Sequence, residues 1–190
     1  MSLQAITTPI DGLLVIEPQI FGDHRGWFLE TWQNKKYSDI GINKTFVQDN
    51  MSFSRYNTLR GLHMQKPAQG KLVQVIQGSI FDVAVDLRVD SFTFGKWYGV
   101  TLSDENKKQF WIPEGFAHGF LVLSHTAIFS YKCTEYYNSK DEITIQWNDP
   151  DIGIEWPLEK IAGTLKKYPT LSDKDANAKR MSDYFDIHSL

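Results

Sequence analysis

The sequence predicts an all-β fold with short helices on its outside near the C-terminus. Strand signals recur about every 8–12 residues between residues 45 and 134, a spacing typical of a sandwich or barrel. Residues 79–89, SIFDVAVDLRV, alternate between an apolar and a mostly polar face, as a strand does. Aromatic residues make up 14% of the chain and favour strands over a helical bundle.

The composition is that of one globular domain, which we expect to cover residues 1–190. The net charge of −3 argues against general nucleic-acid binding, so a few local cations would have to hold any anionic ligand. A single cysteine, Cys133, excludes an internal disulfide framework and suits a reducing compartment.

The N-terminal segment and the hydropathy of the chain indicate its cellular location. The N-terminal segment MSLQAITTPI lacks the basic region and apolar core of a signal peptide. No run approaches the ~18 apolar residues of a membrane span. We therefore expect a cytoplasmic protein without a membrane or nucleic-acid partner.

The first part of the chain divides into short strands and one helix. Residues 10–17 read as a strand, and residues 27–32 resume an extended conformation after a turn over residues 22–26. A helix is predicted within residues 34–44, ending at Gly41.

The next predicted strand, residues 45–54, carries three consecutive polar side chains, Gln48, Asp49 and Asn50. Such a run is unusual inside an otherwise apolar strand. These side chains either bind a ligand or face water on alternate sides, and the pattern leaves both readings open.

Two further strands, Leu59–Met64 and Lys71–Gln77, flank a turn with proline and glycine. His63 lies near the end of the first strand, with the cations Arg60 and Lys71 nearby. A histidine between fixed cations suits an anionic substrate and proton transfer near neutral pH. A histidine with a purely structural role is the alternative.

In the alternating strand, Phe81, Val83, Val85 and Leu87 share one face, and Asp82, Ala84, Asp86 and Arg88 share the other. Parity alone does not decide which face points inward, because a barrel with an internal site can have a polar lumen.

The later strands are predicted over residues 97–103 and 109–113, then from His118 onward, and over residues 127–137. From residue 138 the chain becomes rich in loops, and its last part is expected to form short helices packed outside the domain.

His63 and His118 resemble the histidines of the two cupin motifs, in which the first motif supplies two histidines and a carboxylate. Here Gln65 stands at the second histidine position and Lys71 at the carboxylate position. A catalytic metal needs three or four nitrogen or oxygen ligands, so we expect no metal. A metal-dependent cupin oxygenase is the disfavoured alternative. Glycine-rich phosphate-binding motifs and the GxSxG elbow are absent from the sequence.

Acid–base chemistry without a metal fits the remaining residues. His63 accepts a proton, Lys71 stabilises a negatively charged oxygen, and Tyr131 donates a proton from another direction. A base on one face of a sugar ring and an acid on the other invert a stereocentre. These residue types are therefore those of an epimerase.

Several long segments together resemble the dTDP-4-dehydrorhamnose 3,5-epimerase family: FGDHRGWFLETW, QDNMSFSRYNTLRGLHMQ, QGKLVQVIQGSIFDVAVDLR, FWIPEGFAHGFLVLS, FSYKCTEYY and LSDKD. The resemblance runs from Phe21 to Asp175. It implies a cupin jelly-roll barrel, a homodimer with exchanged N-terminal strands, and neither metal nor redox cofactor. It also implies the substrate dTDP-4-dehydro-6-deoxy-D-glucose and the product dTDP-4-dehydro-L-rhamnose.

The resemblance also assigns roles to residues. His63 is the general base, Asp175 its dyad partner, Lys71 the group that stabilises the enolate, and Tyr131 the opposing acid. The implied substrate-binding residues are Phe21, Arg25, Glu30, Gln48, Asn50, Arg60, His118, Tyr137, Glu142 and Lys174. The resemblance implies that Phe21, Arg25 and Glu30 reach the site of the other subunit across the dimer. It also implies that Tyr137 stacks on thymine.

The sequence differs from the family in two respects, and it leaves two alternative functions open. Gln74 and Gln77 occupy positions that are often basic in relatives, and the tail after Asp175 is less similar. A single-site epimerase, acting at C3 or C5 only, would use the same three side chains. A non-catalytic cupin that binds a sugar nucleotide would bind without exchanging ring hydrogens.

Overall fold

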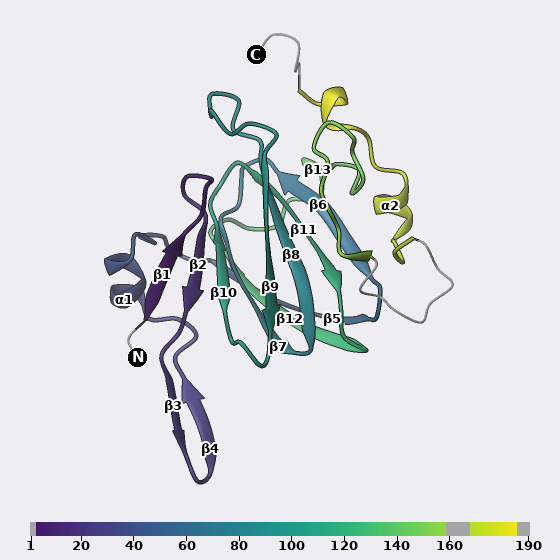
Figure 1. Cartoon of the computed structure of the whole chain (residues 1–190). Helices are drawn as coiled ribbons and strands as arrows, with labels where there is room; N and C mark the ends of the chain where they lie inside the picture. Colours follow the sequence, from purple (N-terminus) through teal and green to yellow (C-terminus); the bar gives the residue numbers. More distant parts are fainter. Residues whose placement is uncertain (1–2, 159–167, 186–190) are drawn as a thin grey trace.

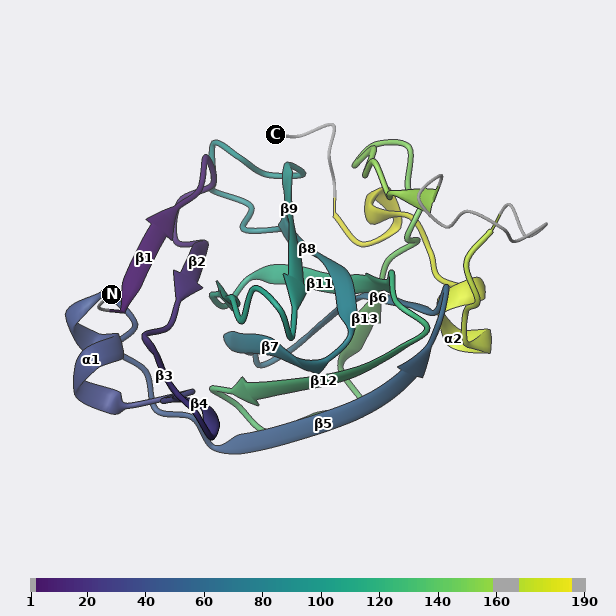
Figure 2. The same cartoon turned by 60° about the horizontal axis from the view of Figure 1, so that its bottom comes forward.

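Two antiparallel sheets face each other and form a jelly-roll barrel, which confirms the all-β prediction (Figures 1 and 2). The computed structural model describes residues 3–158 and 168–185. The six-stranded sheet has the order β1 (Gln4–Thr7), β2 (Leu14–Glu17), β10 (Gln109–Ile112), β7 (Lys71–Gln77), β12 (Thr126–Cys133) and β5 (Gln48–Arg55). The five-stranded sheet has the order β13 (Glu142–Thr144), β6 (Leu59–Gln65), β11 (Phe116–Val122), β8 (Ser79–Asp86) and β9 (Trp97–Ser103).

The barrel interior is closed at one end by apolar side chains from both sheets. Val73, Phe110 and Phe129 come from the six-stranded sheet, and Ile80 and Phe120 come from the five-stranded sheet. All five are buried, so they form the main core between the sheets. Polar side chains occupy the remaining interior and make the site described below.

Both faces of β8 are buried, which answers the question that its alternation left open. Val83 and Val85 pack outward, under C-terminal residues such as Trp156. Asp82 and Ala84 point into the barrel, where Asp82 is fully buried. The mostly polar face is therefore the interior face, and a charged side chain on it belongs to the lumen.

Several predicted boundaries need correction. The strand expected over residues 10–17 begins only at Leu14, because a turn at Asp11–Gly12, with Gly12 at φ +88°, precedes it. Strand β1 was not predicted, since its four residues show no alternation of burial. The helix α1 (Asn34–Asp39) ends just before Gly41, as expected. Strands β6 and β7, consecutive in the chain, lie in different sheets.

A hairpin of β3 (Ile20–Asp23) and β4 (Gly26–Leu29) stands away from the barrel (Figure 1). Its turn holds Arg25, as predicted. The aromatic side chains of Phe21, Trp27 and Phe28 are 47%, 61% and 63% exposed. Among the described residues, Lys107 contacts the hairpin by placing its Nζ 3.9 Å from the Trp27 ring centre. An exposed apolar surface of this size on an extended hairpin indicates a site of contact with another protein chain.

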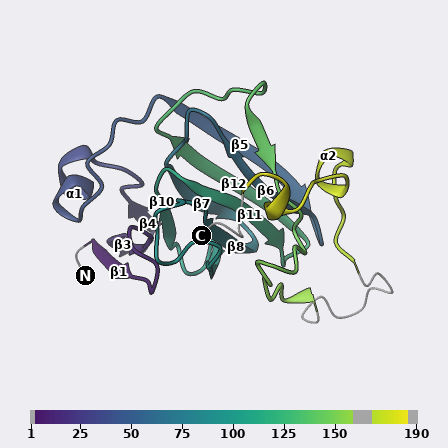
Figure 3. The ribbon, with the colours of Figure 1, turned by 90° about the horizontal axis from the view of Figure 1, so that it is seen from above.

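The predicted C-terminal helices are confirmed within the described residues as α2 (Asp173–Ala176) and the 3₁₀ helix η2 (Met181–Asp183). Helix α2 lies on the opposite side of the barrel from α1 (Figure 3). Backbone hydrogen bonds join Thr170 to Asn57 and Leu59, and Lys179 to Gln146. The segment between them is therefore fastened to the barrel at both ends. Residues 159–167 and 186–190, where further helices were expected, lie outside the described residues.

No helix among residues 3–158 and 168–185 is both long and apolar enough to cross a membrane.

The turn after β8 is organised around the carboxylate of Asp86, whose side chain is buried. Arg88, Ser91 and Thr93 donate hydrogen bonds to it at 2.6–2.7 Å. Burial alone would raise the pKa of Asp86, but these hydrogen bonds lower it to about 2. The ionised carboxylate therefore stabilises the folded state above its unfolded pKa near 3.8, and this contribution is lost as the pH falls towards 2.

We expect Asp86→Asn to lower the free energy of unfolding by roughly 2 kcal/mol at pH 7. The deficit relative to the parent should shrink as the pH falls from about 4 to about 2. Denaturant unfolding at several pH values measures it. Asp90→Asn, at an exposed position in the same turn, is the control and should change stability by less than about 0.5 kcal/mol. A deficit that stays constant with pH would contradict the assigned role.

Candidate active site

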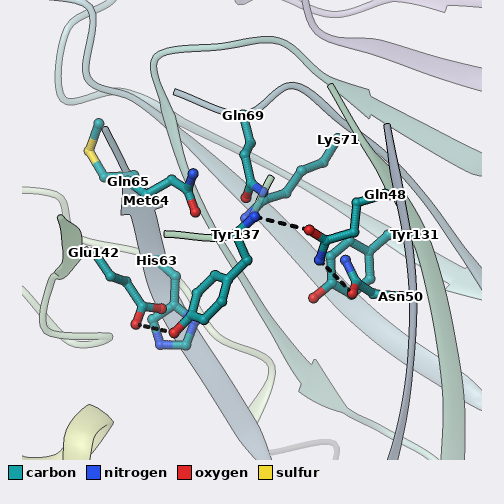
Figure 4. Close-up of a pocket in the computed structure, with 10 residues that line it drawn as sticks. All are labelled: Gln48, Asn50, His63, Met64, Gln65, Gln69, Lys71, Tyr131, Tyr137 and Glu142. Atoms are coloured by element: carbon teal, nitrogen blue, oxygen red, sulfur yellow. Dashed lines mark hydrogen bonds between the residues drawn. The ribbon is translucent and has the colours of Figure 1, made fainter. Parts of the chain in front are cut away.

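A cavity of about 250 Å³ opens between the two sheets (Figure 4). Its walls are mostly polar, and both sheets and the loop before β13 contribute to them. The lining residues are Gln48, Asn50, His63, Met64, Gln65, Gln69, Lys71, Tyr131, Tyr137 and Glu142. Half of the predicted site residues thus line this one cavity, although they come from distant parts of the sequence.

A smaller inner compartment of about 160 Å³ continues from this cavity into the barrel. His63, Lys71 and Tyr131 line both spaces, so they stand at the junction. The inner walls are completed by Ser52, Arg60, His118, Gly119, Phe120 and Phe129. A ligand that fills both spaces would place its inner part among the ionisable side chains at the junction.

His63 is fixed by a carboxylate from the C-terminal segment. Its Nε2 lies 2.6 Å from Oδ1 of Asp175, which is only 4% exposed. Ser172 donates to the other oxygen of this carboxylate at 2.8 Å and also caps α2. Burial opposes ionisation of Asp175, but the hydrogen bonds from His63 and Ser172 lower its pKa. An ionised Asp175 holds the imidazole in one orientation and stabilises it when it gains a proton.

Lys71 and Tyr131 face His63 from the other sheet. Burial lowers the pKa of the Lys71 ammonium, and no described residue accepts a hydrogen bond from its Nζ. Burial also raises the pKa of Tyr131, so its hydroxyl keeps its proton at neutral pH. The junction therefore holds a base on one wall, with a cation and a proton donor on the opposite wall.

A second imidazole–carboxylate pair lies deeper in the barrel. His118 is the cross-strand neighbour of His63, and its Nε2 lies 3.0 Å from each carboxylate oxygen of Asp82. Burial lowers the pKa of His118 and raises that of Asp82, while the contact between them opposes both shifts. Asp82 was not predicted as a site residue, because the alternation of its strand left open which face points inward.

The mouth of the cavity carries a small polar network. Glu142 accepts hydrogen bonds from Tyr137 at 3.1 Å and from Lys174 at 2.8 Å. Gln48 accepts one from the backbone of Tyr137 at 2.9 Å and donates to Asn50 at 2.9 Å. This network joins α2 to β5 across the opening and presents amide, carboxylate, ammonium and phenol groups to a ligand.

The profile of the dTDP-4-dehydrorhamnose 3,5-epimerase family matches residues 7–183, nearly the whole chain. The chain belongs to this family. The resemblance found in the sequence motifs is confirmed, and so is the isomerase class that it implied.

Individual dTDP-4-dehydrorhamnose 3,5-epimerases are similar over most of their length. The enzyme of Salmonella typhimurium is 53% identical over 91% of this chain and 92% of its own. That of Methanothermobacter thermautotrophicus is 51% identical over 94% of each chain. The crystal structure of the Legionella pneumophila epimerase, in complex with dTDP-4-keto-L-rhamnose, covers 94% of this chain and 93% of its own at 53% identity and a TM-score of 0.88.

Three residues that we expected to contact substrate lie outside the cavity lining of the single chain. Phe21 and Arg25 are on the β3–β4 hairpin, where Arg25 pairs with Asp23 at 2.5 Å. Glu30 follows the hairpin and pairs with Lys36. The single chain therefore does not bring these three residues together with the other predicted site residues.

The residues at the cupin-motif positions form hydrogen bonds that differ from those expected of metal ligands. Each histidine of the pair is bonded to one aspartate, and Gln65 donates to the backbone oxygens of Pro67 and Tyr136. Among the described residues, no three His, Cys, Asp or Glu side chains are grouped so that they could hold a metal ion.

Proposed function

We propose that the chain epimerises C3 and C5 of dTDP-4-dehydro-6-deoxy-D-glucose and so produces dTDP-4-dehydro-L-rhamnose. The observation that carries the proposal is the junction of the two spaces, where His63, Lys71 and Tyr131 converge from both sheets. The family, and relatives of about 50% identity with this activity in their names, support the same function.

The proposed reaction moves protons only. His63 removes the proton from C3, next to the C4 carbonyl, and the electron pair of that bond moves onto the carbonyl oxygen. The Lys71 ammonium stabilises the resulting enolate oxygen. Tyr131 then delivers its proton to the opposite face of C3, which inverts the centre, and both side chains re-equilibrate with solvent. The same sequence at C5 completes the product.

The outer cavity is suited to the nucleotide part of the substrate. Lys174 at the mouth supplies positive charge for the diphosphate, and Arg60 adds a second positive charge from the wall of the inner compartment. Tyr137, 56% exposed at the mouth, offers a ring for stacking on thymine. Gln48 and Asn50 offer amide groups for hydrogen bonds. Two members of the polar run, Gln48 and Asn50, are thereby assigned to ligand binding, whereas Asp49 between them is exposed and pairs with Lys132.

Exchange of ring hydrogens with solvent tests the proposal. The protein is incubated with the substrate in D₂O, and NMR measures deuterium at each ring carbon. We expect incorporation at both C3 and C5. Incorporation at one carbon only would assign the protein to the single-site epimerases, and binding without any exchange would indicate a sugar-nucleotide-binding cupin.

We also propose that residues 1–190 form a single domain that acts in the cytoplasm without a metal or redox cofactor. Both sheets contribute to one core, which supports a single cooperative unit. Epimerisation leaves the oxidation state of the sugar unchanged, so it needs no oxidant. One cooperative unfolding transition, and activity that survives a chelator, are the expected results.

The active form is proposed to be a homodimer with exchanged N-terminal strands. The exposed hairpin supplies one apolar surface, and β5, an edge strand with Met51 69% and Phe53 57% exposed, supplies another. A hairpin from a second copy would cover such an edge and bring Arg25 and Glu30 to the neighbouring site.

We expect Phe28→Asp to shift the protein from dimer to monomer, because it places a charge in the apolar contact. Sedimentation velocity measures the change, and activity should fall with dimer content. Phe92→Asp is the matched control, since Phe92 is fully exposed on the turn after β8. A dimeric Phe28→Asp protein, or a monomeric parent, would contradict the proposed exchange.

A further inference from the structure

One side chain of the inner compartment has no hydrogen-bond partner among the residues that the structure describes. The Oγ of Ser52 is sealed from solvent, and no described residue forms a hydrogen bond with it. Ser52 lines the inner compartment together with His63 and Tyr131. A buried hydroxyl without a partner costs free energy, so its presence in a site calls for an explanation.

The position of Ser52 along β5 indicates what it serves. Alternate residues of a strand share a face, and here Gln48 and Asn50 line the outer cavity while Ser52 lines the inner compartment. The next residue on that face, Ser54, is already occupied, since its Oγ accepts a hydrogen bond from Arg60 Nε at 3.0 Å. Ser52 is thus the member of this row that lies beside the proposed reacting groups and keeps its hydroxyl unused.

We propose that Ser52 is a substrate-binding residue whose hydroxyl, after a rotation about its Cα–Cβ bond towards the inner compartment, forms a hydrogen bond with an oxygen on the hexose part of the substrate. The inference rests on the proposed function. The inner compartment is otherwise walled by the rings of Phe120 and Phe129 and by ionisable side chains. A neutral hydroxyl there recognises a sugar hydroxyl or carbonyl without adding charge. The nucleotide, held in the outer cavity, would not reach it.

Two serines on the same face of β5 provide a matched test. Removing the unpartnered hydroxyl in Ser52→Ala should leave the Tm of the free protein unchanged or higher, and should lower kcat/KM by about 10-fold. The affinity for dTDP alone should stay within about twofold, since that ligand lacks the hexose. Ser54→Ala, which removes the acceptor of the Arg60 Nε hydrogen bond, should instead lower the Tm by about 2–4 °C.

The outcomes separate this inference from the proposed function. Parent protein that exchanges no ring hydrogens would refute the function, while the Tm comparison would still test whether the hydroxyl is unused. With an active parent, a Ser52→Ala protein of unchanged kcat/KM would overturn the inference. So would a lowered Tm, which would give the hydroxyl a structural partner, or a weakened affinity for dTDP, which would place it on the nucleotide.

Discussion

His63→Ala is expected to lose about 10²–10⁴-fold in the rate of deuterium incorporation at both C3 and C5. His63 is the proposed base at the junction of the two spaces, and Asp175 Oδ1 lies 2.6 Å from its Nε2. With the imidazole removed, no other described base lies at the junction with its own carboxylate partner. The affinity for dTDP should change little, since that ligand is held in the outer cavity.

His125→Ala is the matched control for this experiment. His125 is exposed in the turn between β11 and β12 and lines neither the cavity nor the inner compartment. It should exchange ring hydrogens at the parental rate. Full exchange in His63→Ala would disprove the assignment of the base, and loss at only one carbon would mean that the two centres use different bases.

Tyr131→Phe should separate proton removal from inversion. The variant keeps the ring in place and removes only the proton that Tyr131 would deliver from the six-stranded sheet. His63 would still form the enolate and return a deuteron to the same face, so exchange with retention should persist. Formation of the inverted product should fall by about 10²–10⁴-fold.

The measurement is an NMR time course that records both deuterium content and configuration at each carbon. Tyr136→Phe, which changes a neighbouring exposed tyrosine, is the control and should invert both centres normally. Parental inversion by Tyr131→Phe would transfer the role of the acid to another group. Loss of exchange and inversion in equal measure would mean that Tyr131 acts in forming the enolate.

The strands from residue 48 to residue 133 could be predicted because alternation and turn residues mark them clearly. Strands β1 and β13 could not, since they have four and three residues and acquire their conformation by pairing with neighbours. The sequence also did not predict which strands pair with each other. Strands β6 and β7 follow each other in the chain but belong to opposite sheets, and this separation is what makes a cavity between His63 and Lys71.

The composition of the site could be predicted only in part. Residue types identified His63, Lys71 and Tyr131, but the partner of His63 was inferred from the family resemblance, since it lies 112 residues further along the chain. Asp82 was missed because alternation alone did not show which face of β8 points into the barrel. The unpartnered hydroxyl of Ser52 has no signature in the sequence at all.

The docking of the segment around Asp175 onto the barrel affects the order in which parts of the protein fold. During synthesis both facing sheets can pair before this segment leaves the ribosome, because their last strand ends at Thr144. The His63–Asp175 hydrogen bond forms only when the segment docks through Thr170 and Lys179. A chain truncated before residue 170 would therefore hold most of the proposed sugar-nucleotide pocket but would lack the carboxylate that orients His63.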